Sequence, residues 1–162
     1  VRVVISNRPD AKGLELAASA GIPTLVIQHR AYPDRASFDA ALVEALQNAG
    51  ARWVVLAGFM RIVTPVLLDA FPSRVINIHP SLLPSFPGVD AQAQALAHGV
   101  KITGCTVHFV DAGTDTGPII AQAAVPVLDG DTRDSLADRI LASEHKTLVR
   151  ALLFCAARAA DA

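Results

Sequence analysis

Short apolar runs alternate along the chain with segments in which apolar residues recur at helical spacing. The apolar runs predict strands at residues 1–6, 24–28, 53–58, 74–79, 104–110 and 118–127. The helical spacing predicts helices at residues 11–21, 34–50, 65–71, 91–99 and 131–159. This alternation is typical of an α/β protein with a doubly wound, mostly parallel sheet. Only seven residues, 111–117, join the last two strands, so we expect one antiparallel pair near the C-terminal end.

The composition is that of one domain with a sizeable core. Of 162 residues, 52% are hydrophobic, and the formal net charge is −1. Such a balance provides no basic face for nucleic acid and no polybasic segment for a membrane. No apolar run has the length of a membrane span, and the first residues lack the features of a signal peptide, so we expect a cytoplasmic protein. Cys105 and Cys155 form no disulfide framework and fit a reducing compartment.

The stretch VINIHPSLLPSFPG, residues 75–88, contains both a predicted strand and side chains that can take part in catalysis. Alternate strand residues point to the same face, so Asn77 and His79 are predicted to lie side by side at a carboxyl end. Asn offers a neutral amide donor for a developing oxyanion, and His titrates near neutral pH. The plainer interpretation, which an isolated N-x-H favours, is a turn residue and a strand-end histidine.

A second polar stretch, DAGTDTGP, follows the strand that ends in HFV and occupies residues 111–118. It is either a polar turn or a carboxylate-bearing loop in which Asp115 orients a histidine, as in the His–Asp half of a catalytic triad. The chain has no G-x-S-x-G nucleophile motif. We therefore expect direct transfer between two bound substrates.

Two further stretches limit the choice of ligands. AGFMRIVTP, residues 57–65, is either an apolar loop that wraps a flat heterocycle or ordinary core packing. The first loop reads NRPD and is not rich in glycine, so it makes a poor phosphate cradle. Histidines occur without metal-ligand spacing, and we predict no metal.

Taken together, AGFMRI, NIHPSLLPSFPG and DAGTDTGPII resemble the folate-dependent formyltransferases over nearly the whole chain. The match is closest to the branch that formylates glycinamide ribonucleotide in purine biosynthesis. The resemblance implies a Rossmann-like sheet and transfer of a formyl group from 10-formyltetrahydrofolate, the cosubstrate, to the amine of glycinamide ribonucleotide. It also implies a cis peptide at Leu83–Pro84.

By motif, the resemblance assigns catalysis to Asn77, His79 and Asp115, and contact with glycinamide ribonucleotide to Glu144. It assigns the folate site to Arg35, Met60, Arg61, Ile62, Val63, Asp111, Ala112, Gly113 and Thr114.

The chain departs from this family at its start, where the family has a strand, a G-S-G-[ST]-N phosphate loop and a helix. We therefore expect a single formyltransferase domain, residues 1–162, that lacks these elements and comes from a longer chain. Alternatives stay open: a methionyl-tRNA formyltransferase, whose loop usually reads SLLP-x-x-RG, a formyltetrahydrofolate hydrolase, or a non-catalytic folate-binding remnant. The oligomeric state is not predicted.

Overall fold

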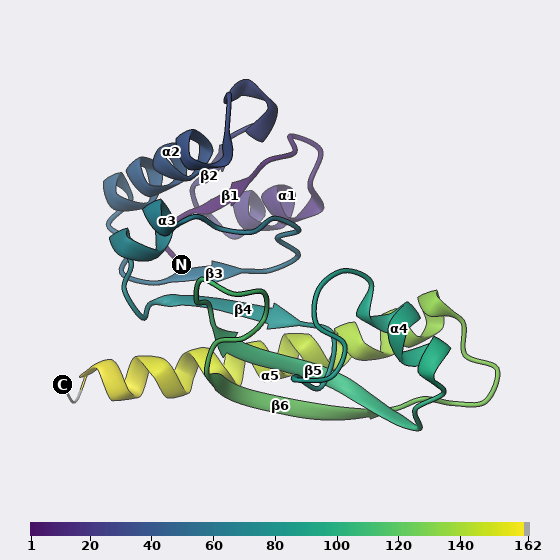
Figure 1. Ribbon diagram of the computed structural model, residues 1–162. Helices are drawn as coiled ribbons and strands as arrows, with labels where there is room; N and C mark the ends of the chain where they lie inside the picture. Colours follow the sequence, from purple (N-terminus) through teal and green to yellow (C-terminus); the bar gives the residue numbers. More distant parts are fainter. Residues whose placement is uncertain (161–162) are drawn as a thin grey trace. The chain divides into compact units, whose positions relative to one another are not determined.

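A computed structural model describes residues 1–160, which form two compact units (Figure 1). The first unit comprises Val1–Val54 and Arg61–Arg74. The second comprises Val55–Met60 and the chain from Val75 onward. No helix in the described part of the chain combines the length and the apolar character needed to cross a membrane.

The first unit begins as a strand–helix–strand segment. Its elements are β1 (Val4–Ser6), α1 (Lys12–Ser19), β2 (Thr24–Val26), the short 3₁₀ helix η1 (His29–Ala31), α2 (Arg35–Asn48) and α3 (Pro65–Ala70). β1 and β2 pair in parallel as a two-stranded sheet, with Ile5 opposite Leu25. The Asp34 carboxylate caps α2 by accepting from the Ser37 N–H at 2.7 Å, which fixes where this helix begins.

The second unit is built on a four-stranded sheet in the order β3-β4-β5-β6. Its strands are β3 (Val54–Leu56), which begins at the boundary of the two units, β4 (Val75–His79), β5 (Ile102–Phe109) and β6 (Ile119–Pro126). Its helices are α4 (Ala91–His98) and α5 (Arg133–Ala160). The strands and helices predicted from the sequence are thus confirmed, with ends that differ by a few residues.

The pairing of the strands confirms one prediction and adds to it. The antiparallel pair expected near the C-terminal end is present as β5–β6. The neighbouring pair, β4–β5, is antiparallel as well, and the sequence did not predict it. Connection length cannot decide this direction, because the segment from β4 to β5 contains α4 and can serve either a parallel or an antiparallel neighbour.

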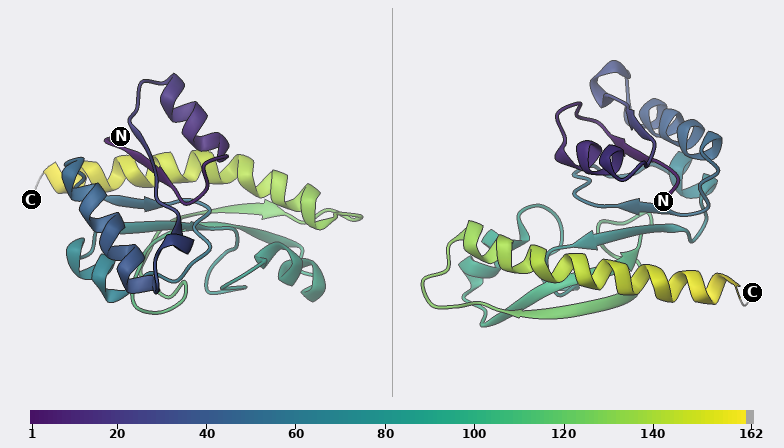
Figure 2. Two further views of the ribbon diagram at one scale, coloured as in Figure 1. Left: turned by 90° about the horizontal axis from the view of Figure 1, so that it is seen from above. Right: turned by 180° about the vertical axis from the view of Figure 1, so that it is seen from behind.

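Helix α5 covers one face of β5 and β6 (Figure 2). Side chains alternate along a strand, and β5 turns Cys105 toward this helix, where it packs with Val125, Leu136 and Ile140 in a buried apolar cluster. The preceding residue, Gly104, lies on the face of the sheet opposite to Cys105. A Cβ there would lie 2.0 Å from the Ala123 carbonyl oxygen, so only glycine fits.

The loop after β4 is held by hydrogen bonds to side chains of β5 and β6. The Thr106 hydroxyl on β5 accepts from the Leu83 N–H at 3.0 Å and donates to the Ser81 carbonyl at 2.7 Å. The Gln122 amide on β6 donates to Thr106 Oγ1 and to the Leu83 carbonyl, both at 3.0 Å. The Leu83–Pro84 peptide is cis, which confirms the expectation from the resemblance.

Candidate active site

The site is built on β4 and the strand that runs antiparallel to it. Asn77 and His79 are two residues apart on β4 and so share one face. The β4–β5 register places His108 opposite Asn77 and Thr106 opposite His79. The predicted neighbours are therefore side by side, and a second histidine joins them from β5.

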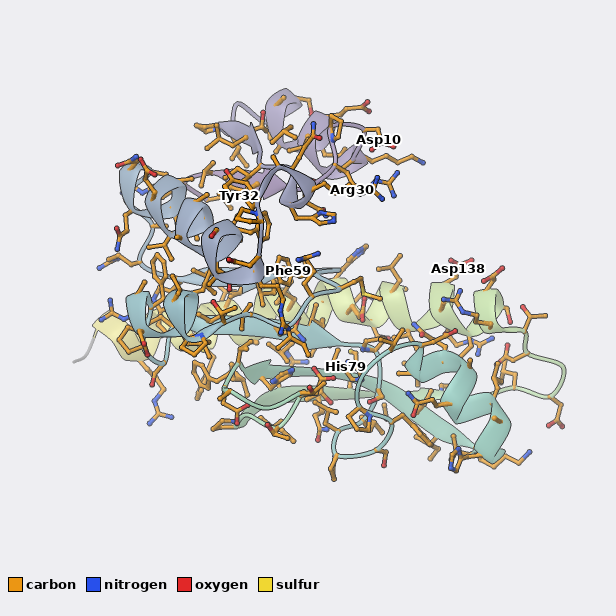
Figure 3. All side chains as sticks on the ribbon, turned by 45° about the horizontal axis from the view of Figure 1, so that its top comes forward. Asp10, Arg30, Tyr32, Phe59, His79 and Asp138 are labelled. Atoms are coloured by element: carbon orange, nitrogen blue, oxygen red, sulfur yellow. The ribbon has the colours of Figure 1, made fainter. Side chains whose placement is uncertain are left out.

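His79 has an acceptor at each ring nitrogen. Its Nδ1 lies 3.3 Å from Asp115 Oδ2, and its Nε2 lies 2.8 Å from the Phe86 carbonyl oxygen. The imidazole is 5% exposed, at the carboxyl end of β4 (Figure 3). A carbonyl oxygen only accepts, so Nε2 carries a proton. Both contacts are satisfied together when Nδ1 is protonated as well, and the ring then forms an ion pair with Asp115.

Asp115 lies between the two histidines. Its Oδ1 is 3.6 Å from His108 Nε2, and its Oδ2 accepts from the Gly88 N–H at 2.8 Å. The Asp115 side chain is 14% exposed, and its backbone is left-handed with a φ of 56°. Non-glycine residues seldom adopt this conformation, and they do so most often where the surroundings enforce it.

His108 fixes the orientation of Asn77. The Nδ1 of His108 lies 2.9 Å from the Phe109 carbonyl, which can only accept, so Nδ1 carries a proton. In the neutral ring, Nε2 is then an acceptor, and it receives an N–H of the Asn77 amide at 3.2 Å. The second N–H of the Asn77 amide is then available as a donor.

Glu144 on α5 is electrostatically coupled to this cluster. Burial raises the pKa of the Glu144 carboxyl, and the nearby His145 and His79 act in the opposite direction. Both histidines favour the ionised form of this carboxyl, and His79 does so although 65 residues separate it from Glu144 in the sequence (144 − 79).

The other predicted residues of the second unit lie at loop surfaces. Asp111 Oδ1 accepts from the Gly113 N–H and the Thr116 hydroxyl, and so it closes a turn inside the loop. Asp111, Ala112, Gly113 and Thr114 are exposed, as is Met60. These residues are therefore accessible to a ligand.

In the first unit, the Arg61 guanidinium lies over the Phe38 ring, 5.5 Å from its centroid. The buried Asp39 accepts from the N–H and the hydroxyl of Thr64, at 2.6 and 2.8 Å. Arg35 is exposed at the first position of α2, Ile62 is exposed and Val63 is buried. Among the described residues, no three or more His, Cys, Asp or Glu side chains are grouped to hold a metal ion.

A model of the family described as "Formyl transferase" matches residues 1–152. The chain belongs to the formyl transferase family. The phosphoribosylglycinamide formyltransferase of Mycobacterium tuberculosis is 48% identical to it over 150 residues, which are 93% of this chain and 70% of the relative. The Drosophila pseudoobscura pseudoobscura "Trifunctional purine biosynthetic protein adenosine-3" is 50% identical over 157 residues, which are 97% of this chain but only 12% of that protein.

Solved structures of formyl transferases are similar to most of this chain. The crystal structure of glycinamide ribonucleotide transformylase 1 from Symbiobacterium toebii matches with a TM-score of 0.90 and 61% identity, over 92% of this chain and 70% of that one. The chain therefore has the Rossmann-like α/β fold of these enzymes.

Sequence reasoning missed three groups that the formyl transferase fold brings to His79 and Asp115. These are the imidazole of His108, the carbonyl of Phe86 and the N–H of Gly88. His108 belongs to the predicted strand that contains TVHF. The alternation of strand side chains shows which residues share a face with His108, but not which residue lies opposite it on the neighbouring strand. Main-chain groups leave no mark in the sequence, so the other two depend on the loop conformation alone.

Proposed function

We propose that this chain carries the activity that transfers the formyl group of 10-formyltetrahydrofolate to the amine of glycinamide ribonucleotide in purine biosynthesis. One observation carries the proposal: in a chain of the formyl transferase family, Asn77 and His79 share one face of β4, and Asp115 lies 3.3 Å from His79. It is supported by relatives named phosphoribosylglycinamide formyltransferase at 44–48% identity.

In the proposed reaction, the substrate amine attacks the formyl carbon and a tetrahedral oxyanion forms. The free N–H of Asn77 and the protonated His79 stabilise this oxyanion, a contribution typically worth about 10²–10³ in rate for one donor. The C–N bond to N10 of the folate then breaks. The nitrogen of the product loses a proton and N10 gains one, and His79 serves as the acid and base between them.

Asp115 stabilises the imidazolium form of His79 through the contact at 3.3 Å. Asn77 is presented in the correct orientation by His108. We propose no metal, because the donors of this cluster and the proton of His79 suffice for acyl transfer at a constant oxidation level.

We further assign the folate to the main-chain groups of Met60, Arg61, Ile62 and Val63 and of Asp111, Ala112, Gly113 and Thr114, with Arg35 as a contact for its acidic tail. Exposed apolar side chains at Met60 and Ile62, 77% and 54% accessible, support the assignment of the first of these loops. Glu144 is assigned to the amine of glycinamide ribonucleotide, which its carboxylate attracts as an ammonium group.

The test is formyl transfer by the purified full-length protein, followed by mass spectrometry of formylated glycinamide ribonucleotide. We expect Asp115→Asn to lower kcat by about 10² or more, because an electrostatic partner of the catalytic acid is lost. The matched control is Asp129→Asn, since the Asp129 side chain is fully exposed and, within residues 1–158, pairs only with the surface residue Lys101. Wild-type turnover in Asp115→Asn would refute the assignment.

The alternatives give other results in the same assay. Formate release without an amine acceptor would indicate a hydrolase, and formylation of methionyl-tRNA would indicate the sibling transferase. Isothermal titration that detects folate binding but no binding of glycinamide ribonucleotide would indicate a non-catalytic remnant.

A further inference from the structure

Two main-chain groups of one short segment, residues 86–89, contact the catalytic cluster. The Phe86 carbonyl accepts from His79 Nε2 at 2.8 Å, and the Gly88 N–H donates to Asp115 Oδ2 at 2.8 Å. Two non-glycine residues in and beside this segment, Phe86 and Asp90, have left-handed backbones with φ of 55° and 56°. Such a conformation is unfavourable by itself, so the segment depends on support from its surroundings.

Helix α4 supplies that support through Gln94. Its side-chain Nε2 donates to the Pro87 carbonyl at 3.1 Å and to the Val89 carbonyl at 2.9 Å. An amide NH₂ group has two hydrogens, so both bonds are made at once. The two carbonyls flank Gly88, and a single side chain therefore fixes both sides of the residue that contacts Asp115.

A second side chain of α4 holds the other end of the segment. The His98 ring lies 5.1 Å from the Phe86 ring, centroid to centroid. The Nδ1–H of His98 donates to the Gln94 carbonyl one turn earlier at 3.0 Å, which orients the ring. The residue whose carbonyl meets His79 is thus also packed against α4.

We propose that Gln94 is a positioning residue that determines which nitrogen of His79 exchanges protons. By holding residues 87 and 89, it keeps the Phe86 carbonyl on Nε2, so that nitrogen retains its proton. Nδ1, which faces Asp115, is then the nitrogen that gains and loses a proton. This role rests on the proposed formyl transfer, although the state of the imidazole can be measured without turnover.

The experiment uses Gln94→Met, which keeps the length of the side chain and removes its donors. Its control is Gln92→Met on the same helix, because the Gln92 side chain makes no hydrogen bond among the described residues. Nitrogen-15 NMR at an alkaline pH, where the imidazoles are neutral, reports which nitrogen of each histidine carries the proton. In the wild type and in Gln92→Met we expect His79 with its proton on Nε2 and His108 with its proton on Nδ1.

In Gln94→Met we expect a mixture of the two His79 tautomers, while the His108 signal is unchanged and so shows that the fold is intact. We also expect kcat to fall roughly 10- to 100-fold, because small displacements of a catalytic group have effects of that size, with KM for both substrates within about twofold of the wild type.

An unchanged His79 tautomer in Gln94→Met would overturn the inference, as would a rise in KM with unchanged kcat. If the His108 tautomer signal changes as well, Gln94 supports the fold in general, and its positioning role is again refuted. A wild type without formyl transfer refutes the proposed function, but the tautomer comparison still decides the role of Gln94.

Discussion

The hydroxyl of Thr106 offers a quantitative test of how the loop beside the site is held. Thr106 is fully buried, and its Oγ1 joins the Leu83 N–H, the Ser81 carbonyl and the Gln122 amide. Thr106→Val keeps the shape of the side chain and removes all three bonds. Gln122 retains its bond to the Leu83 carbonyl, whereas the Leu83 N–H and the Ser81 carbonyl lose their partner.

Leaving one buried backbone group without a partner costs about 1–3 kcal/mol, so two such groups predict a loss of about 2–6 kcal/mol in the free energy of unfolding. For a chain of this size, that corresponds to a fall in Tm of about 4–24 °C. Urea denaturation, monitored by circular dichroism, measures the free energy directly, and an unchanged m-value would show that the two states are still comparable.

The same strand provides the matched control. Thr103 is 2% exposed, and its Oγ1 has no hydrogen-bond partner among the described residues. Thr103→Val removes an unpaired hydroxyl from an apolar face, so we expect a change between zero and a gain of about 1 kcal/mol. If Thr106→Val and Thr103→Val destabilise the protein equally, the hydrogen bonds of Thr106 do not hold the loop and the argument fails.

Three further predictions concern stability. Arg139 holds the pKa of Asp131 well below its usual range, so the ionised carboxylate stabilises the fold at pH values above the ordinary Asp pKa of about 3.9, and less so at lower pH. The Tm difference between wild type and Asp131→Asn should therefore shrink below about pH 4, and a constant difference would contradict this. Gly104→Ala places a Cβ 2.0 Å from the Ala123 carbonyl and should cost about 3 kcal/mol or prevent folding, so a wild-type urea midpoint would be evidence against the close approach of the strands. Burial raises the pKa of Glu144, so the stability of the wild type should fall relative to that of Glu144→Gln as the pH rises past the ordinary Glu pKa of about 4.3. The same stability difference between the two proteins at pH 4 and at pH 7 would show that the charge is well solvated.

The sequence by itself determined the local elements and the faces of the strands. Periodicity located each strand and helix within a few residues. Apolar residues repeat about every two positions in a strand and every three to four in a helix, and this repeat is visible within a short stretch of sequence. It also placed Asn77 and His79 on one face of β4, and the short link 111–117 required the antiparallel β5–β6 pair. The family resemblance, rather than any periodicity, supplied the expectation of the cis peptide and favoured one of the two interpretations of Asp115.

Only the tertiary structure decided which groups meet at the site. The direction of β5 beside β4 puts His108 opposite Asn77, and no local pattern encodes a partner 31 residues away. Likewise, the Phe86 carbonyl and the Gly88 N–H reach His79 and Asp115 because a left-handed loop is held by α4. Every residue has such main-chain groups, so their function comes from position and not from residue type.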